Sequence, residues 1–481
     1  KGAVALVLHA HLPYVRSAQP GSLEEDWFFQ ALIECYLPLL ETLERASADP
    51  HQQPKLTIGL SPTLLSLLSD QDLKQRFPDW LNERLDLLPK ADPSLRAGAE
   101  HLAATIERHQ RAWQSCDGDL IQRFAALQRL GVVDLLTCGA THGYLPLLRH
   151  HPEAVRGQLR TAVREHQRLV GERPLGIWLP ECAYYEGLDR WMRDAGLRYA
   201  VLDGHGLLHG RPRPRYGVYA PICSRNGVAF FGRDSDATLP VWSAKDGYPG
   251  DPHYREFHRD LGWDLPIEEL KPLGLDQPRP LGLKLHRVTD HSAPLDRKRP
   301  YEPGVAAERV KEHAADYLQG RRRQLDQLGA AMDVSPLLVA PFDAELFGHW
   351  WFEGPAFLSQ LFQQAPQEGV SFTRLRDVLN NVGQLQLCDP CPSSWGQGGY
   401  HDYWLNDSNA WIIPEWEKAS AAMVQRCSRG VGSEQAMQWL QQAARELLLA
   451  QSSDWSFILR AGTTTELAKE RVQRHLGRFW Q

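Results

Sequence analysis

Short apolar runs alternate with longer stretches of helical periodicity along most of the chain. The runs are continuous and rich in aliphatic residues, which is typical of strands buried on both faces of a sheet. Helical patterns lie between many of them, as at 23–46, 62–70 and 304–329. Strands that alternate with helices indicate a mainly parallel sheet. The predicted strands are 3–11, 55–60, 132–139, 175–180, 199–203, 281–289 and 336–343.

The number and spacing of these strands predict an α/β fold, a barrel related to the (β/α)8 type with inserted loops. An open, doubly wound sheet is the alternative. No GxGxxG segment and no phosphate-binding P-loop follows the first strands. The pattern therefore does not support nucleotide binding.

Two segments depart from this pattern. Residues 203–280 are rich in Gly, Pro, Arg and Asp and have little periodicity, so we expect a long excursion of loops and short helices over the barrel mouth. After residue 385, a Pro-, Gly- and Ser-rich segment leads into helical patterns. We therefore expect a barrel domain over 1–385 and a helical C-terminal domain over 386–481. In 434–450 the apolar residues share one helical face: Ala436, Trp439, Leu440, Ala443, Leu447 and Ala450.

Composition and charge narrow the class of protein. The chain has 481 residues, 43% hydrophobic and 23% charged, so it can bury a sizeable core. Its formal net charge of −6 does not favour a nucleic-acid partner. It has no apolar stretch of about 18 residues that would cross a membrane. His9 and His11 interrupt the first apolar run, which indicates a strand rather than a signal peptide.

Eight cysteines are scattered along the chain. This distribution fits free thiols in a reducing cytoplasm better than a disulfide framework. Cys388 and Cys391 form a CxxC pair, but a zinc site usually needs a second pair or histidines at a fixed spacing. A structural loop is therefore the favoured interpretation of the pair, and a metal or redox role is the alternative.

Polar side chains recur where the predicted strands end. His9 and His11 end the first strand, His142 follows the third, Glu181 follows the fourth and Asp343 ends the last. In a barrel, the carboxyl ends of the strands form the face on which active sites are built. We therefore expect these side chains to converge.

Glu181 and Asp343 end two different strands, so both carboxylates can face one substrate bond. A pair about 5–5.5 Å apart performs retaining glycoside chemistry, in which one carboxylate attacks the anomeric carbon and the other protonates the leaving oxygen. The apolar run before Glu181 would raise its pKa, and nearby donors would favour its anion. A helix cap or a pairing with arginine is the alternative role for such a residue.

The histidines open a second hypothesis. His9 and His11 alternate on a strand and therefore point to the same face. With His142, and with Asp203 or Asp343, they would form the site of a metal-dependent hydrolase or sugar deacetylase. Hydrogen bonding to sugar hydroxyls, or to each other, is the simpler role.

Tryptophan is unusually frequent, with 16 residues. Many stand beside Gly, Asp or Pro rather than inside apolar runs. The indole ring offers a broad apolar face and one N–H donor, which suits stacking on sugar rings. Core packing is the alternative role for any one of them.

Six segments together carry a resemblance to a known family. They resemble family 57 of the glycoside hydrolases, and most closely its 1,4-α-glucan branching enzymes. The resemblance runs from His9 to about Asp454. The segments, in order, are HAHLPYVR (9–16), CGATHGYLPLL (138–148), GIWLPECAY (176–184), GYPGDPHYREFHRDLGWD (247–264), PFDAELFGHWWFEGP (341–355) and SSWGQGGYHDYWLNDSNAWI (393–412).

The resemblance implies an incomplete (β/α)7 barrel followed by a helical C-terminal domain that contributes to the glucan-binding cleft. The residue that matches the family's nucleophile is Glu181. The residue that matches its general acid/base is Asp343, not the neighbouring Glu345. The family needs no metal or other cofactor.

The resemblance also implies an α-glucan partner, such as amylose, glycogen or a starch-like polysaccharide. Family members bind it through histidines, an arginine of the excursion, tryptophans and an aspartate of the helical domain. The matching residues are His9, His11, His142, Arg259 or Arg255, Trp263, Trp395, Trp404 and Asp454.

One departure from the family pattern bears on the reaction. Similar branching enzymes close the site with a loop that carries a tyrosine, but this chain has none between Gly232 and Asp246; the nearest that follows is Tyr248. Without it, water would compete with the sugar hydroxyl. An α-amylase or a 4-α-glucanotransferase is therefore the alternative to a branching enzyme. A catalytically weak glucan-binding protein is a remoter one.

Overall fold

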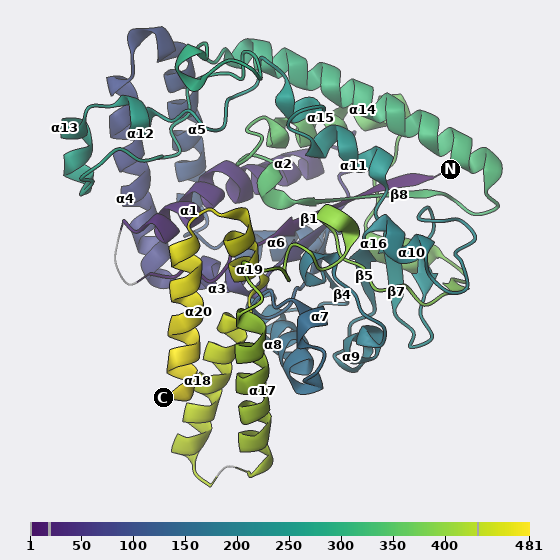
Figure 1. The fold of residues 1–481 in the computed structure, drawn as a ribbon. Helices are drawn as coiled ribbons and strands as arrows, with labels where there is room; N and C mark the ends of the chain where they lie inside the picture. Colours follow the sequence, from purple (N-terminus) through teal and green to yellow (C-terminus); the bar gives the residue numbers. More distant parts are fainter. Residues whose placement is uncertain (1, 18–20, 431) are drawn as a thin grey trace.

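Seven mutually parallel strands form the centre of the described chain (Figure 1). The structure is a computed structural model and describes residues 2–17, 21–430 and 432–481. Around the centre the parallel strands follow the order β8, β1, β2, β3, β4, β5, β7. The strands are β1 (Ala3–Ala10), β2 (Leu56–Leu60), β3 (Val133–Leu136), β4 (Gly176–Ile177), β5 (Tyr199–Leu202), β6 (Ile222–Cys223), β7 (Ala229–Gly232), β8 (Leu337–Asp343) and β9 (Gln386–Leu387).

The strands close into a barrel with two weak seams. A parallel bridge between Thr137 and Ile177 joins β3 to β4. On the other side, the N–H of Asp234, just after β7, donates a 2.9 Å hydrogen bond to the carbonyl of Val339 on β8. The short strands β6 and β9 extend the second sheet outside the parallel set. The architecture is that of the incomplete (β/α)7 barrel that the family resemblance implied.

Six of the predicted strands are confirmed, and the strand predicted at 281–289 is wrong. That segment is a loop whose backbone groups pair with other loops: the carbonyl of Leu283 accepts from the N–H of Leu261, and that of Leu285 from Tyr301. Its leucines are buried because the loop packs on the helices of the main core. The burial of this segment comes from loop packing and not from a strand ladder.

The seventh parallel strand is β7, which lies inside the predicted excursion of 203–280. Its four residues are buried but too few to show a period in the sequence. The prediction at 175–180 is shortened to β4, because the chain turns at Pro180 into a 3-10 turn. The irregular segment over the barrel mouth therefore begins after α11 and includes 281–289.

Helices cover the outside of the barrel (Figure 1). The predictions at 62–70 and 304–329 are confirmed as α3 and α14, and 23–46 is helical with a π-turn at its centre. The helices before the C-terminal region are α1 (Leu23–Ala31), the π-turn η1 (Leu32–Tyr36), α2 (Leu37–Ala48), α3 (Pro62–Ser69), α4 (Gln71–Leu87), α5 (Arg96–Gln114), α6 (Leu120–Arg129), α7 (Leu145–Leu148), α8 (Pro152–Val170), α9 (Leu188–Asp194), α10 (Gly204–Leu208), α11 (Ser235–Trp242), α12 (Leu261–Asp264), α13 (Ile267–Leu270), α14 (Pro303–Ala331), α15 (Gly354–Glu368) and α16 (Leu375–Asn381).

The C-terminal region has four helices in its described part, α17 (Ile412–Ser428), α18 (Glu434–Ala450), α19 (Ser453–Ala461) and α20 (Thr465–Trp480). Before them, the chain crosses the carboxyl end of the barrel. There the N–H of Trp395 donates to the carbonyl of Glu181 at 2.9 Å. In the described residues, no helix has both the length and the hydropathy that a membrane crossing requires.

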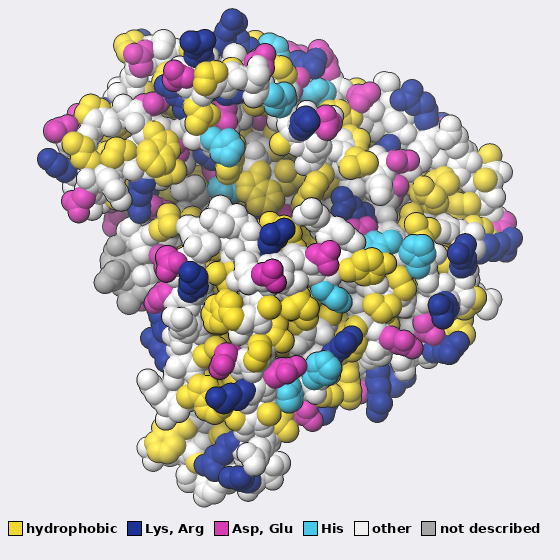
Figure 2. All heavy atoms as spheres, in the orientation of Figure 1, with side chains coloured by type: hydrophobic (Ala, Val, Ile, Leu, Met, Phe, Trp, Pro, Cys, Tyr) yellow, Lys and Arg dark blue, Asp and Glu magenta, His cyan; other side chains and the backbone are white. Residues whose placement is uncertain are grey.

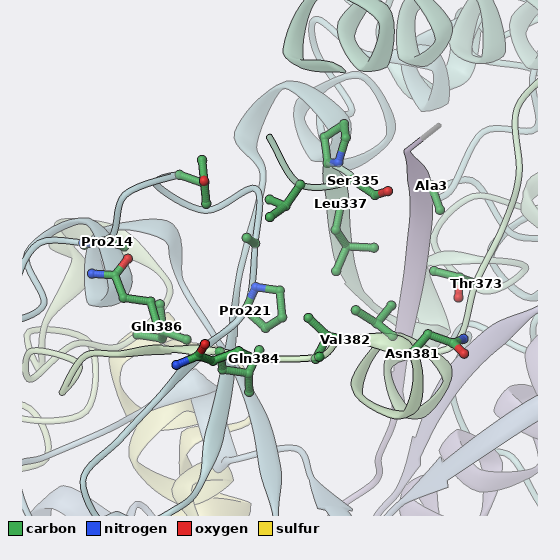
Figure 3. A pocket seen from close by; sticks show the side chains of 18 of the residues that line it. Ala3, Pro214, Pro221, Ser335, Leu337, Thr373, Asn381, Val382, Gln384 and Gln386 are labelled. Carbon is green, nitrogen blue, oxygen red and sulfur yellow. The ribbon is translucent and has the colours of Figure 1, made fainter. Parts of the chain in front are cut away.

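The two ends of the barrel differ. The interior is filled by inward-facing residues such as Ala5, Val7, Val201 and Val339, all buried. At the amino ends of the strands, where β6 and β8 diverge, a cavity of about 420 Å³ is lined mainly by uncharged residues (Figure 3). His9 continues the inward-facing side of β1 and lies at the polar, carboxyl end of the barrel.

Candidate active site

The site lies at the carboxyl ends of the strands, below the segment that carries α12 and α13. Figure 2 shows that this face of the molecule is hollowed beside that segment. Glu181 follows β4 with a left-handed backbone, φ 61° and ψ 24°. The next residue, Cys182, is also left-handed, with φ 49°. Such non-glycine conformations cost on the order of 1–3 kcal/mol each and cluster at functional sites.

Two side chains donate hydrogen bonds to the carboxylate of Glu181. Trp395 Nε1 donates to Oε2 at 2.8 Å, and Ser453 Oγ donates to Oε1 at 3.0 Å. Burial raises the pKa of Glu181 to about 7, while these two donors act in the opposite direction. Glu181 is therefore a partly buried carboxylate whose anion receives two hydrogen bonds from the protein.

Asp343 ends β8 directly beside His9, its partner in the register of β1 and β8. Burial raises the pKa of Asp343 well above its usual range, and the negative charges of Glu345 and Glu181 raise it further. Within the described chain, no hydrogen-bond donor stabilises its anion. The two predicted carboxyl groups thus interact electrostatically and have different surroundings.

A line of hydrogen bonds connects the histidines to Glu181. His9 Nε2 lies 3.0 Å from His142 Nε2, and His142 Nδ1 lies 2.7 Å from Ser453 Oγ. Because Ser453 gives its proton to Glu181, His142 Nδ1 is the donor to Ser453, and His142 Nε2 accepts from His9. This assignment needs a neutral His142 ring, and a neutral His9 ring is compatible with it. Burial lowers the pKa of His9 and of His142 well below the usual value, in agreement with it.

His11 has the opposite charge preference. Its Nε2 lies 3.1 Å from both oxygens of Asp454 on α19, and its Nδ1 lies 2.9 Å from Ser61 Oγ. Although burial acts against it, the Asp454 carboxylate raises the pKa of His11. In turn His11 holds the pKa of partly buried Asp454 at about 2. This ion pair joins the first barrel strand to the C-terminal helices.

Glu345 is a third buried carboxyl group beside the predicted pair. Its Oε1 accepts a 2.5 Å hydrogen bond from the Tyr36 hydroxyl and a 3.0 Å bond from the backbone N–H of His11. Burial raises its pKa to about 7. Glu345 therefore links the π-turn η1 to the histidine strand and adds negative charge next to Asp343.

Two groups of side chains in the histidine cluster are candidates for a metal site. The ligand atoms of His11, His142 and Asp454 lie within 4.8 Å of one another, as do those of His9, Cys138 and His142. However, the rings of His11 and His142 are stacked, with centroids 3.9 Å apart and planes 12° apart. Stacked imidazoles direct their in-plane lone pairs side by side, whereas tetrahedral coordination needs them to converge. The residues as placed do not fit such a centre.

Of the predicted tryptophans, the structure brings Trp395 into the site. Its ring meets that of Trp178 at 5.1 Å, and Trp178 in turn stacks on His9 at 4.8 Å. Trp404 is buried and stacks on Tyr144 at 4.9 Å. Trp404 therefore contributes to the packing around the site.

The residues predicted in the excursion lie elsewhere. Arg255 donates to Glu34 at 2.9 Å in a buried ion pair. Arg259 donates to Asp264 at 3.2 Å, within the same irregular segment. Trp263 on α12 is 52% exposed. The structure does not bring these three into the cluster around Glu181.

The predicted position of the closing loop is occupied by α11. The indole of Trp242, its last residue, lies 5.7 Å from that of Trp395. Tyr248 is turned away, and its hydroxyl donates to Asp316 on α14 at 2.6 Å. An indole of α11 therefore borders the site where a tyrosine was sought.

Several residues of the site were missed. Ser453 and Tyr36 carried no pattern of their own in the sequence. Trp178 and Glu345 stood inside resemblance segments but had no assigned role. Ser453 reaches Glu181 across 272 residues of chain. Its position beside Asp454, in a segment that the resemblance singled out, was the one available signal.

Comparison with known proteins identifies the family of the chain. Residues 5–389 match the model of glycosyl hydrolase family 57, and residues 415–481 match that of the 1,4-alpha-glucan branching enzyme C-terminal region. The chain is 32% identical to a 1,4-alpha-glucan branching enzyme of Thermococcus kodakarensis, over 99% of this chain and 72% of that protein.

Solved structures give the same result. An α-amylase from Thermotoga maritima, AmyC, matches with a TM-score of 0.92 and 35% identity, over 100% of this chain and 92% of that one. A GH57-type branching enzyme from Pyrococcus horikoshii matches with a TM-score of 0.89 and 32% identity, over 98% and 88% of the two chains. By both its sequence and its fold, the chain belongs to glycosyl hydrolase family 57.

Proposed function

We propose that this protein is a 1,4-α-glucan branching enzyme that works by a retaining mechanism. It cleaves an α-1,4 bond of an α-glucan and re-forms it as an α-1,6 branch. The match of residues 415–481 to the C-terminal region of branching enzymes supports this choice within the family. The similarity to the Thermococcus enzyme over nearly the whole chain supports it further.

In the first half of the reaction, Glu181 attacks the anomeric carbon. The bond from that carbon to the glycosidic oxygen breaks, and Asp343 transfers its proton to this oxygen. The product is a glycosyl ester on Glu181. Asp343 is left as the anion, whose basicity burial and the charge of Glu345 increase.

In the second half, a 6-hydroxyl group of an acceptor chain attacks the same carbon. Asp343 takes the hydroxyl proton, the ester bond breaks, and the Glu181 carboxylate is restored. The new bond is the α-1,6 branch. If water takes the place of the hydroxyl group, the same steps give hydrolysis.

One observation carries this assignment of roles: Glu181 receives two side-chain hydrogen bonds, whereas Asp343 lies among acidic groups. The donors favour the anion that a nucleophile needs. The surrounding negative charge favours the protonated form that an acid needs. The asymmetry therefore supports Glu181 as nucleophile and Asp343 as acid/base.

The helical region takes part in this proposed site. Ser453 and Asp454, both of α19, contact Glu181 and His11. This supports a division into a barrel domain over 1–385 and a helical domain over 386–481 that share one glucan-binding cleft. The free thiols of all eight cysteines support a reducing compartment, and we infer the cytoplasm.

An α-amylase is the second candidate. The similarity to the Thermotoga α-amylase favours it, as does the absence of a tyrosine between Gly232 and Asp246. The carboxyl pair performs the same first step in both enzymes and does not separate them.

Proton NMR of amylose incubated with the protein separates the two functions. It counts α-1,6 linkages against new reducing ends. We expect α-1,6 signals to rise with few reducing ends. Reducing ends without branches would instead identify a hydrolase.

A further inference from the structure

Part of the apolar face of α18 is uncovered. Near the end of the helix, Leu447 and Ala450 are buried. Nearer its start, on the same face, Trp439 is 67% exposed and Leu440 is only partly buried. An exposed indole on the helix face that the periodicity predicts to be packed indicates a binding surface.

The uncovered part of α18 lines a groove of about 650 Å³ between α17, α18 and α20. These helices run side by side at the lower end of the molecule in Figure 1, where Figure 2 shows hydrophobic and basic side chains close together. We call it the tryptophan groove. Its main residues are Arg426, Arg429, Trp439, Gln442, Arg478 and Trp480.

The groove combines two open indole rings with neutral and cationic donors. Trp480 is 48% exposed, and the ammonium group of Lys418 lies over its ring at 5.6 Å from the centroid. Both indoles are therefore accessible, and one of them already has a cation beside it. The guanidinium and amide groups beside them donate to oxygen atoms. Among the described residues, no carboxylate side chain lines the groove. Flat apolar faces bordered by donors match the C–H faces and hydroxyl groups of a sugar chain.

The groove adjoins a larger hollow on the side of the barrel. Gln442 and Arg478 line both the groove and a neighbouring cavity of about 930 Å³. That cavity extends to Thr141, the residue before His142. From Trp439 to Leu448, whose carbonyl accepts a hydrogen bond from the Thr141 hydroxyl, α18 rises by about 14 Å.

We propose that the tryptophan groove is a second binding site for the α-glucan, which holds a part of the polysaccharide remote from the bond that is cut. The identity of this ligand rests on the proposed function. Stacking on Trp439 and Trp480 gives affinity for long chains. An oligosaccharide that is too short to extend from the active site along α18 to Trp439 does not reach the groove.

The test measures glycogen binding by affinity electrophoresis. All proteins carry Glu181→Gln, so that the glycogen is not consumed. Trp439→Ala is compared with Met437→Ala, which truncates a 43% exposed side chain of the same helix outside the groove. Thermal unfolding of each variant confirms the fold. In the active background, both substitutions are also assayed on a short malto-oligosaccharide.

We expect Trp439→Ala to raise the Kd for glycogen about tenfold, as for the loss of one stacked aromatic ring, and Met437→Ala to leave it unchanged. Turnover of the short substrate should be unaffected by either. An unchanged Kd in Trp439→Ala overturns the proposal. A change in oligomeric state without a change in glycogen binding also overturns it, because the groove would then be an interface between copies. So does a larger rise in the Kd for heparin than in the Kd for glycogen.

The two proposals fail separately. If the parent protein neither cuts nor transfers glucan but binds glycogen through Trp439, the proposed function falls and the groove stands. If it branches amylose and Trp439→Ala binds glycogen normally, the groove falls alone.

Discussion

The indole N–H of Trp395 donates a 2.8 Å hydrogen bond to Oε2 of Glu181, across 214 residues of sequence. The backbone N–H of Trp395 also donates to the carbonyl of Glu181. The segment that crosses the barrel mouth is therefore fastened to Glu181, in the turn that follows β4. The hydrogen bond from this segment orients the Glu181 carboxylate and favours its charged form.

Replacing Trp395 with phenylalanine should change the pH dependence of the reaction. The hydrogen bond from Nε1 stabilises the anion, so its loss raises the pKa of Glu181 above about 7. We expect the acid limb of kcat/KM to move upward by about one pH unit, the effect of losing one hydrogen bond to a charged group. Initial transfer rates on amylose across the pH range measure it.

Trp404→Phe is the matched control. The Nε1 of Trp404 is buried and has no partner among the described residues, so the same substitution removes no hydrogen bond. Equal shifts in the two variants would show that the effect comes from packing.

Glu181→Ala and Asp343→Ala should each lower the transfer rate by about a thousandfold or more, because each removes a group that takes part in both half-reactions. Azide distinguishes the two roles. In Glu181→Ala it takes the place of the nucleophile and gives a glycosyl azide of inverted configuration. In Asp343→Ala it intercepts the glycosyl-enzyme and gives a retained azide. The opposite configurations would exchange the assignments.

Glu345→Gln should narrow the active pH range from the alkaline side. The Glu345 charge raises the pKa of Asp343, so removing it lowers that pKa, and the acid loses its proton at lower pH. We expect the basic limb of kcat/KM to move downward. Glutamine retains an oxygen that accepts from Tyr36 and from the N–H of His11. A basic limb that stays in place would mean that Glu345 acts through structure alone.

Asp454→Asn should destabilise the protein more at pH 5.5 than at pH 9. The pKa of His11 is raised, so its contribution is complete below the usual 6.5 and disappears as the pH rises through the folded value. The pKa of Asp454 is about 2, so its contribution is complete above the usual 3.8 and is lost as the pH falls. The pair therefore stabilises most between these limits.

The expected loss of unfolding free energy at pH 5.5 is about 2 kcal/mol, typical of a hydrogen-bonded buried pair that loses one charge. A double-mutant cycle with His11→Asn, followed by urea unfolding at both pH values, isolates the interaction. Equal coupling at pH 5.5 and pH 9 would contradict an ionic bond.

The sequence by itself determined most of the barrel. Continuous apolar runs identified strands such as β1 and β8, because a strand buried on both faces must be apolar throughout. It also placed Glu181 and Asp343 at one end, since parallel strands end at the same edge. The segment 281–289 misled the prediction, because a loop packed on helices has the same composition as a strand.

Only the tertiary structure decided the partners of the polar groups. Periodicity reports whether a position is buried and says nothing about what it meets. Arg255 is therefore found on Glu34, and the donors of Glu181 come from Trp395 and Ser453, both far along the chain. The charge of each buried group depends on those partners and on burial, so the acid and base character of the site arises only when the chain has folded.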